Sequence, residues 1–314
     1  MKKKSKSIND FKNIKIDDIN NIIEKADYFK NKVKSNDLND KTILKNILKY
    51  KKIGLCFFEN STRTKISFEV AANNLGAKTF NLDTQTSSVA KGETVIDTLK
   101  VLERYGMDCF VVRHNQSGII NLLDKHFDLP IINAGDGTHN HPTQALLDFY
   151  TLREHFKNFN KLNICIVGDV IHSRVAKSNI ELISKFGANI SIFSPGTLFP
   201  YHLKENGQFK DITFYTNWKD VIANNHVVML LRIQKERMTG GFLPDSSEYS
   251  RFYGVNNNIL EQIKNKEIYI MHPGPVNYGL ELTQNANDYH RNLILEQVEN
   301  GIYIRMAVLD YLLT

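Results

Sequence analysis

Short apolar runs alternate with longer amphipathic segments along most of this chain. An apolar run of strand length followed by a helical pattern is typical of parallel strands that helices cover on both faces. No repeat of fixed short period is present, so a repeat architecture is not indicated. The chain is therefore predicted to have an α/β fold. The expected strands are Ile53–Phe58, Thr79–Leu82, Cys109–Arg113, Pro130–Asn133, Asn163–Val167, Asn189–Phe193, Val227–Leu231 and Glu267–Met271.

Helical patterns lie before and between these runs, for example at Ile16–Val33, Val95–Tyr105 and Thr143–His155. Each has apolar residues at the spacing of one helical face. In the first segment these residues are Ile19, Ile22, Ile23 and Ala26.

The length of the chain, 314 residues, points to two domains, since one domain has about 100–200 residues. A polar stretch at Arg153–Leu162 separates about four strand–helix units from about four more. We therefore expect two doubly wound domains with parallel sheets flanked by helices, residues 1–152 and 153–291. The apolar C-terminal pattern, about 292–314, could cover either domain, and we expect it to pack back onto the first. Ligands of such sheets bind beyond the carboxyl ends of the strands, which predicts an active site in the crevice between the domains.

The composition excludes several classes of protein. The net charge of +6 fits ordinary solubility, or else an anionic partner such as nucleic acid or a phosphorylated substrate. Cys56, Cys109 and Cys165 each lie inside an apolar run without metal-binding spacing, so we expect reduced, buried thiols. The lysine-rich N-terminus lacks an apolar signal region, and no run is long enough to span a bilayer, so we expect a cytosolic protein with no membrane partner.

Small and basic residues follow the first expected strand at Ser61–Thr64. Ser61 is a good N-cap for a helix that Gly76 would end, and a helix N-terminus favours phosphate. Arg63 in the first turn is unusual, because the helix dipole disfavours a cation there. It could be neutralised by a bound anion, or it could pair with Glu59 or Glu69.

Two further strands of the first half end in polar residues. Arg113 is the last residue of one of them. After the other comes His141-Pro142, where proline suits the first helical position and Gln144 follows on the same side. His141 could donate a hydrogen bond to a carbonyl oxygen, or it could be an ordinary capping residue.

In the second half, Arg174 and Arg232 also come at, or just beyond, strand ends. Arginine binds phosphate and carboxylate with two parallel hydrogen bonds, each worth about 1.5–3 kcal/mol when charge-assisted. Four such arginines, two in each half, predict anionic ligands that carry a phosphate and one or more carboxylates. The segment that leads to Arg174 lacks GxGxxG, and Walker A, HExxH, GxSxG and CxxC motifs are also absent. No cofactor and no metal are therefore expected.

Together these motifs resemble the aspartate and ornithine carbamoyltransferases over nearly the whole chain. The matching stretches are FFENSTRTKISFE, SSVAKGETVIDT, HPTQALLD, GDVIHSRVAKSN, LRIQKER and MHPGPVN. The ornithine branch would have an HCLP-type motif at His272–Pro275 and an SMG-type motif at Arg232–Gln234. The sequence is thus similar to the aspartate branch.

The resemblance implies specific roles for these residues. It implies that the phosphate of carbamoyl phosphate binds Ser61, Thr62, Arg63, Thr64 and Arg113. Its carbamoyl end would bind His141 and Gln144, with help from the backbone near Gly274 and Pro275. The carboxylates of L-aspartate would bind Arg174, Arg232 and Gln234, together with Lys91. Ser87 and Lys91 resemble residues that enter a neighbouring subunit's site, which implies a homotrimer with shared active sites. Glu59 and Arg237 resemble residues that hold the domains closed.

The implied reaction transfers the carbamoyl group of carbamoyl phosphate to the amino group of L-aspartate. The products would be N-carbamoyl-L-aspartate and phosphate, in an early step of de novo pyrimidine biosynthesis. Arg63, Thr64 and His141 would stabilise the oxyanion of the tetrahedral intermediate, and Lys91 would add positive charge nearby.

Two alternatives stay open at this point. One is a carbamoyltransferase for another amine, such as ornithine. The other is a basic nucleic-acid-binding module, but its lysines and aromatic residues would cluster on one face, whereas these arginines fall at strand ends. We therefore expect no nucleic-acid partner. The sequence is silent on a regulatory chain or a dihydroorotase partner.

Overall fold

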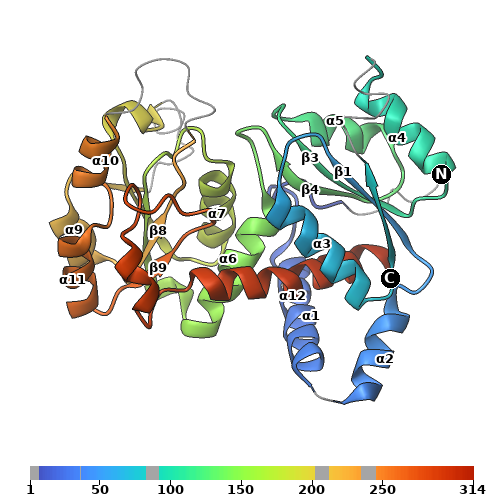
Figure 1. The fold of residues 1–314 in the computed structure, drawn as a ribbon, viewed down its shortest axis with the longest axis horizontal. Helices are drawn as coiled ribbons and strands as arrows, with labels where there is room; N and C mark the ends of the chain where they lie inside the picture. Colours follow the sequence, from blue (N-terminus) through green and yellow to red (C-terminus); the bar gives the residue numbers. More distant parts are fainter. Residues whose placement is uncertain (1–6, 36, 83–91, 202–211, 235–244) are drawn as a thin grey trace. The chain divides into compact units, whose positions relative to one another are not determined.

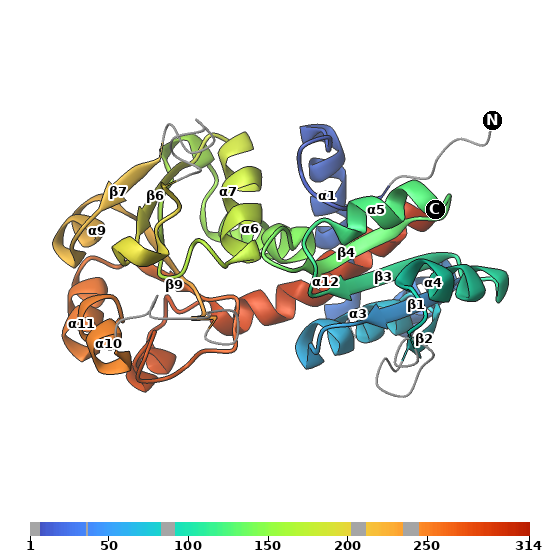
Figure 2. The same ribbon diagram turned by 90° about the horizontal axis from the view of Figure 1, so that it is seen from above.

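The apolar runs of the first half form a four-stranded parallel sheet in the order β2-β1-β3-β4. The computed structural model describes residues 7–35, 37–82, 92–201, 212–234 and 245–314. Figure 2 shows the four strands in this order. Three of them are almost wholly buried, whereas the edge strand β2 is largely exposed. The strands are β1 (Lys52–Phe57), β2 (Lys78–Leu82), β3 (Cys109–His114) and β4 (Ile131–Asp136).

Helices cover both faces of this sheet, as a parallel sheet requires. Helices α4 and α5 share an apolar cluster with β1, β3 and β4, and α3 and α12 lie on the other face (Figure 1). The helices of the first half are α1 (Ile16–Lys34), α2 (Leu38–Ile47), α3 (Thr62–Asn74), α4 (Val95–Arg104) and α5 (Ile119–His126). Before α1, Ile8 forms a parallel bridge with Ile132 and so extends the sheet beyond β4.

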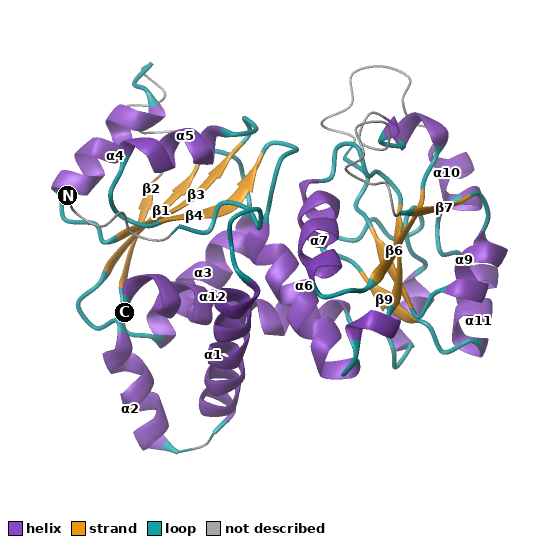
Figure 3. Ribbon diagram, turned by 180° about the vertical axis from the view of Figure 1, so that it is seen from behind, coloured by secondary structure: helices purple, strands orange, loops and turns teal. Residues whose placement is uncertain are grey.

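The second half forms a five-stranded parallel sheet in the order β7-β6-β5-β8-β9. Helix α7 lies on one face, and α9 and α11 pack on the other (Figure 3). The strands are β5 (Asn163–Val167), β6 (Asn189–Phe193), β7 (Thr213–Tyr215), β8 (Val227–Leu230) and β9 (Tyr269–Met271). The helices are α7 (Arg174–Lys185), α9 (Trp218–Asn224), α10 (Ser246–Phe252) and α11 (Asn257–Asn265), with 3-10 turns at Phe159–Lys161, Gly196–Leu198 and Gln284–Asp288.

The chain divides into two units, residues 1–150 with 299–314, and residues 151–298. Both divisions fall inside helices, α6 (Pro142–His155) and α12 (Ile294–Leu313). The sequence analysis set the corresponding boundaries at residue 152 and at about 292. No helix among the described residues is long and apolar enough to cross a membrane.

The predicted α/β architecture is confirmed, but one strand was missed. The three residues of β7 form a partly exposed edge strand, which is too short to give an apolar run. Strand β4 also continues to Asp136, beyond the predicted end at Asn133, because the small and polar residues there are buried.

The predicted apolar face of the first helix, the helix start at Pro142 and the burial of the cysteines are confirmed. The expected apolar face of α1 is buried, and α6 begins at Pro142. All three cysteines are free and buried, and burial raises the pKa of the Cys56 and Cys165 thiols to about 12. Burial likewise raises the pKa of Cys109.

Gly76 ends α3 with a left-handed backbone, φ 79°, that favours glycine. A Cβ at this position would lie 1.9 Å from the backbone oxygen of Lys45. We expect Gly76→Ala to destabilise the first unit by about 2–4 kcal/mol, because strained backbone and overpacking add. Urea unfolding followed by circular dichroism measures the loss.

Gly106→Ala is the matched control. Gly106 has nearly the same backbone, φ 82°, but its nearest neighbour to an added Cβ is the flexible Lys52 Nζ at 3.5 Å. The control should therefore lose only the free energy of unfolding that a non-glycine residue loses in a left-handed backbone conformation. Equal losses in the two variants would contradict a role for the Lys45 contact.

Candidate active site

The N-terminus of α3 follows directly after β1 and presents a basic first turn. Ser61 holds the N-cap position with extended backbone, as predicted, but its side chain makes no capping hydrogen bond. The first turn contains no acidic residue, Arg63 is exposed, and Thr64 is buried. The helix start therefore offers backbone N–H groups and a cation to an anionic ligand.

Arg113 lies on the neighbouring strand β3 and is held by an ion pair. Its Nη2 donates to Glu59 Oε1 at 2.8 Å, and its Nη1 donates to the Ala134 carbonyl oxygen at 3.3 Å. The register pairs Phe57 with Arg113, so the residues that follow β1 lie beside this arginine. The orientation of the guanidinium group is therefore fixed from two sides at the carboxyl ends of the strands.

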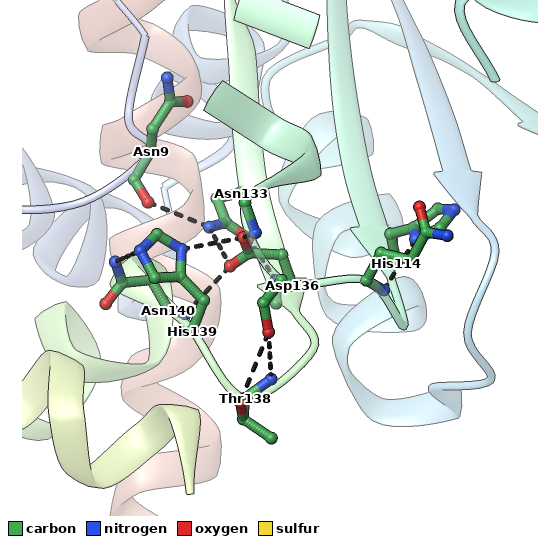
Figure 4. A network of polar contacts seen from close by, with 11 residues as sticks. Asn9, His114, Asn133, Asp136, Thr138, His139 and Asn140 are labelled. Carbon is green, nitrogen blue, oxygen red and sulfur yellow. Dashed lines mark hydrogen bonds and ion pairs between the residues drawn. The ribbon is translucent and has the colours of Figure 1, made fainter. Parts of the chain in front are cut away.

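Asp136, at the end of β4, is a fully buried carboxylate that accepts four hydrogen bonds. Figure 4 shows it beside Asn133, His139 and Asn140. Its donors are Asn133 Nδ2 at 2.9 Å, the Asn140 N–H at 3.0 Å, the Gly118 N–H at 2.8 Å and His139 Nδ1 at 3.0 Å. These bonds fix the turn between β4 and α6, which ends at His141.

The electrostatics of this turn follow from the same carboxylate. The hydrogen bond to Asp136 raises the pKa of His139 above its ordinary 6.5, against the opposing effect of burial. Because the folded-state pKa is raised, the pair stabilises the fold below pH 6.5 and loses this contribution as the pH rises through the raised value. Burial instead lowers the pKa of His114.

His141 directly precedes helix α6 and Gln144 lies in its first turn, where the Gln144 N–H donates to the His141 carbonyl oxygen at 3.0 Å, and both residues are buried. Gln144 Nε2 donates to Asp148 Oδ1 at 2.9 Å. Because a carboxylate only accepts, this bond fixes the amide and leaves Gln144 Oε1 as an acceptor toward a ligand. His141 and Gln144 can thus offer complementary groups to one carbonyl-and-amide ligand.

In the second unit Arg174 is the first residue of α7 and is buried. Ser173 caps the helix by accepting from the Ala176 N–H at 3.1 Å. Before it, the buried Asp169 accepts from the backbone and ring of His172, and burial raises the pKa of this carboxyl. This sequence of turns after β5 holds Arg174 at the carboxyl edge of the sheet.

Arg232 and Gln234 follow β8, the strand that pairs with β5, and both are partly buried. A cavity of about 460 Å³ opens here within the second unit. It is lined by Arg232, Ile233, Ser246, Ser247, Asn277, Tyr278, Gly279 and Leu280. Gly274 and Pro275, joined by a cis peptide bond, follow β9 at the same sheet edge.

The structure thus brings the predicted residues together in two groups. The first unit holds Glu59, Ser61, Thr62, Arg63, Thr64, Arg113, His141 and Gln144, and the second holds Arg174, Arg232, Gln234, Gly274 and Pro275. Ser87, Lys91 and Arg237 lie outside the described residues. In each unit, one arginine lies in the helix that follows a strand and the other lies in, or just after, the neighbouring strand. These are Arg63 after β1 with Arg113 in β3, and Arg174 after β5 with Arg232 after β8.

Comparison with known proteins identifies the family. Residues 6–154 match the carbamoyl-phosphate-binding domain of the aspartate/ornithine carbamoyltransferases, and residues 160–312 match their aspartate/ornithine-binding domain. The chain belongs to this family. The resemblance noted in the sequence is therefore confirmed.

Curated relatives and solved structures are similar to this chain over most of its length. The aspartate carbamoyltransferase catalytic subunit of Chlorobium chlorochromatii is 46% identical over 92% of this chain and 91% of its own. That of Desulfotalea psychrophila is 43% identical over 93% and 89%. Aspartate transcarbamoylase from Trypanosoma cruzi, in complex with carbamoyl phosphate and aspartate, has a TM-score of 0.85 at 29% identity, covering 99% and 98%. The M. jannaschii catalytic subunit has a TM-score of 0.83 at 34% identity, covering 98% and 97%.

Sequence reasoning missed two buried carboxylates near these groups. Asp136 lies in NAGDG, just beyond the expected strand end at Asn133, and Glu281 lies between two leucines. The available signal was a lone acidic residue flanked by apolar or small residues, since such a carboxylate must find hydrogen-bond donors when it is buried.

We expect Asp136→Asn to destabilise the first unit by about 1–3 kcal/mol, because the new NH₂ group meets two N–H donors whichever oxygen it replaces, Asn133 with Asn140 or Gly118 with His139. Turnover should fall as well, since the turn before His141 loosens. Urea unfolding and a carbamoylation assay measure the two effects. Asp17→Asn, which changes an exposed residue in the first turn of α1, is the control. It should leave the free energy of unfolding and the turnover nearly unchanged. Full turnover in a folded Asp136→Asn protein would contradict the positioning role.

Proposed function

We propose that this chain transfers the carbamoyl group of carbamoyl phosphate to the amino group of L-aspartate. The products are N-carbamoyl-L-aspartate and phosphate, and the reaction is an early step of pyrimidine synthesis. The observation that carries the choice of L-aspartate is the pair of arginines after β5 and β8. Two arginines on neighbouring strands suit two carboxylates, whereas ornithine has one carboxylate and a cationic side chain that they would repel.

The first unit supplies the groups for carbamoyl phosphate. Arg63 and Arg113, on and after neighbouring strands, bind the phosphate together with the N-terminus of α3 and the hydroxyl groups of Ser61, Thr62 and Thr64. His141 donates to the carbamoyl oxygen, and Gln144 Oε1 accepts from the carbamoyl amide. The backbone at Gly274 and Pro275 contributes further acceptors.

The reaction needs no covalent intermediate with the protein. The neutral amine attacks the carbamoyl carbon, a C–N bond forms, and the C–O bond to phosphate breaks as the phosphate leaves with the amine proton. Arg63, Thr64 and His141 stabilise the oxyanion, and Lys91 adds positive charge. The protein contributes mainly orientation and fixed electrostatics.

The remaining assignments concern the assembly and its motion. We propose a homotrimer in which Ser87 and Lys91 serve the site of the adjacent subunit. The relatives are named catalytic subunits, which supports assembly into an oligomer. Glu59, which pairs with Arg113, and Arg237 stabilise the closed state of the domains.

Arg63→Ala should lower turnover by about 10²–10³-fold, because it removes a donor to the transition state. The assay follows carbamoyl aspartate formation at saturating substrates. Arg104→Ala, which truncates an exposed arginine at the end of α4, is the matched control and should retain full turnover. Near-normal turnover of Arg63→Ala would overturn the assignment.

A substrate comparison accompanies this test. We expect the unmodified protein to carbamoylate L-aspartate and to leave ornithine and N-acetylornithine unchanged. Preferred carbamoylation of ornithine would contradict the proposed role of Arg174 and Arg232.

Subunit mixing tests the shared site. Arg63→Ala and Lys91→Gln chains, each inactive alone, should regain activity when dissociated and reassembled together, because some sites then combine two intact sets of residues. The solution mass of the unmodified protein should be that of a trimer. Reassembled mixed trimers without any recovered activity would argue against sharing.

A further inference from the structure

A buried carboxylate of the second unit accepts hydrogen bonds from two segments that are distant in the sequence. Glu281 is 2% exposed. Its Oε1 accepts from the Ile233 N–H at 2.8 Å, and its Oε2 lies 3.0 Å from His272 Nε2. Asn277 donates to both oxygens, at 2.8 Å from its backbone and 2.7 Å from its side chain. Four donors occupy the roughly four acceptor positions of a carboxylate, so Glu281 has none left for a substrate.

The hydrogen bonds also determine the tautomer of His272. The Gly274 N–H donates to His272 Nδ1 at 2.8 Å, so Nδ1 carries no proton. The proton must therefore lie on Nε2, which donates to Glu281. Because His272 is 1% exposed, water does not compete for either ring nitrogen.

A continuous line of hydrogen bonds thus runs from Gly274 through His272 and Glu281 to Ile233. Ile233 lies between Arg232 and Gln234, which we assign to L-aspartate. Gly274 precedes Pro275, and their backbone is assigned to the carbamoyl group. Two of the segments of the second unit that are assigned to substrate are therefore bonded to one imidazole–carboxylate pair.

We propose that His272 and Glu281 are positioning residues that fix the spacing between the aspartate-binding and carbamoyl-binding segments of the second unit. This proposal rests on the proposed function for the identity of the two ligands. Neither side chain is exposed enough to bind substrate, so both act through the backbone of Ile233 and Gly274.

The pair is itself held by the fold. The Glu281 carbonyl oxygen accepts from the Val255 N–H at 3.0 Å, and Val255 bridges to Leu282. The His272 N–H donates to Gln297 Oε1, on α12, at 3.0 Å. The pair is therefore anchored between the sheet edge and two packed segments, which allows it to set a distance.

Glu281→Gln tests the proposal with an almost unchanged shape. Its amide keeps one acceptor, but its NH₂ group meets two donors whichever oxygen it replaces: Ile233 N–H and Asn277 Nδ2 at Oε1, or Asn277 N–H and His272 Nε2–H at Oε2. The clash in either orientation disturbs the arrangement of all the groups bonded to this side chain. Both substrate segments should shift, and kcat/KM for L-aspartate should fall by about 10²-fold, the size expected for a displacement near 1 Å. KM for carbamoyl phosphate should rise as well.

His272→Gln separates the two segments. Glutamine can place its amide nitrogen near the position of Nε2 and keep the bond to Glu281, but it leaves the Gly274 N–H without Nδ1. We expect KM for carbamoyl phosphate to rise more than KM for L-aspartate. A merely structural role would give no such difference between the two substrates.

Hydrogen exchange of the backbone gives a readout that does not depend on activity. Peptides that contain Gly274 and Ile233 should both exchange faster in Glu281→Gln, whereas only the Gly274 peptide should do so in His272→Gln. Trp218 is the only tryptophan of the chain and is buried in the second unit, so its fluorescence reports whether each variant is folded. Glu261→Gln, an exposed change on α11, is the control and should leave exchange and kinetics unchanged.

The outcomes separate the two proposals. If the unmodified protein does not carbamoylate L-aspartate, the proposed function fails, and the exchange pattern alone decides the positioning role. Folded variants with unchanged exchange in both peptides, or with unchanged kinetics in an enzyme active on L-aspartate, would overturn it. Faster exchange with the expected split between the two KM values would support it.

Discussion

A buried carboxylate that accepts four hydrogen bonds organises the candidate active site in each unit. Asp136 does this at the end of β4, and Glu281 does it beyond β9. Burying a charge is costly unless donors surround it, so each carboxylate remains stable only if its loops keep one arrangement. The same requirement that fixes the loops also fixes the residues that we propose to bind substrate, His141 in one unit and Arg232 in the other.

The parallel sheets explain why cations gather at these loops. The carboxyl ends of all strands of a parallel sheet lie at one edge. There Arg113 lies near the end of β3 and Arg232 follows β8, while Arg63 and Arg174 lie in the helices that follow the neighbouring strands β1 and β5. No acidic residue occupies the first turn of α3 or α7, and Glu59 pairs with Arg113. In the proposed function, the negative charge of the substrates adds to the contacts that these arginines already make.

Much of this organisation could be predicted from the sequence, because strand ends and helix starts have strong local signals. The apolar runs gave eight of the nine strands in the described part of the chain, and Pro142 and Gly76 marked helix boundaries correctly. β7 gave no signal, since three partly exposed residues do not form an apolar run. The partners of Asp136 and Glu281 could not be foreseen, because donors such as the Gly118 and Ile233 N–H groups come from segments that only the fold brings near. Family motifs indicated the residues that we propose to contact ligand, whereas the buried carboxylates near them became apparent only in the structure.

The discontinuity of the first unit has a consequence for how the chain acquires its structure. Residues 299–314 complete that unit, and Ile304, Met306, Ala307, Val308 and Leu309 are fully buried in it. During synthesis these residues emerge only after the whole of the second unit, residues 151–298, has left the ribosome. Until then, part of the core around strands β1 to β4 stays exposed to water, because residues 299–314 have not yet covered it. The second unit is continuous in sequence and can already fold. The order in which the two units can finish folding is thus the reverse of the order in which their synthesis begins. The second unit starts later but can be completed first.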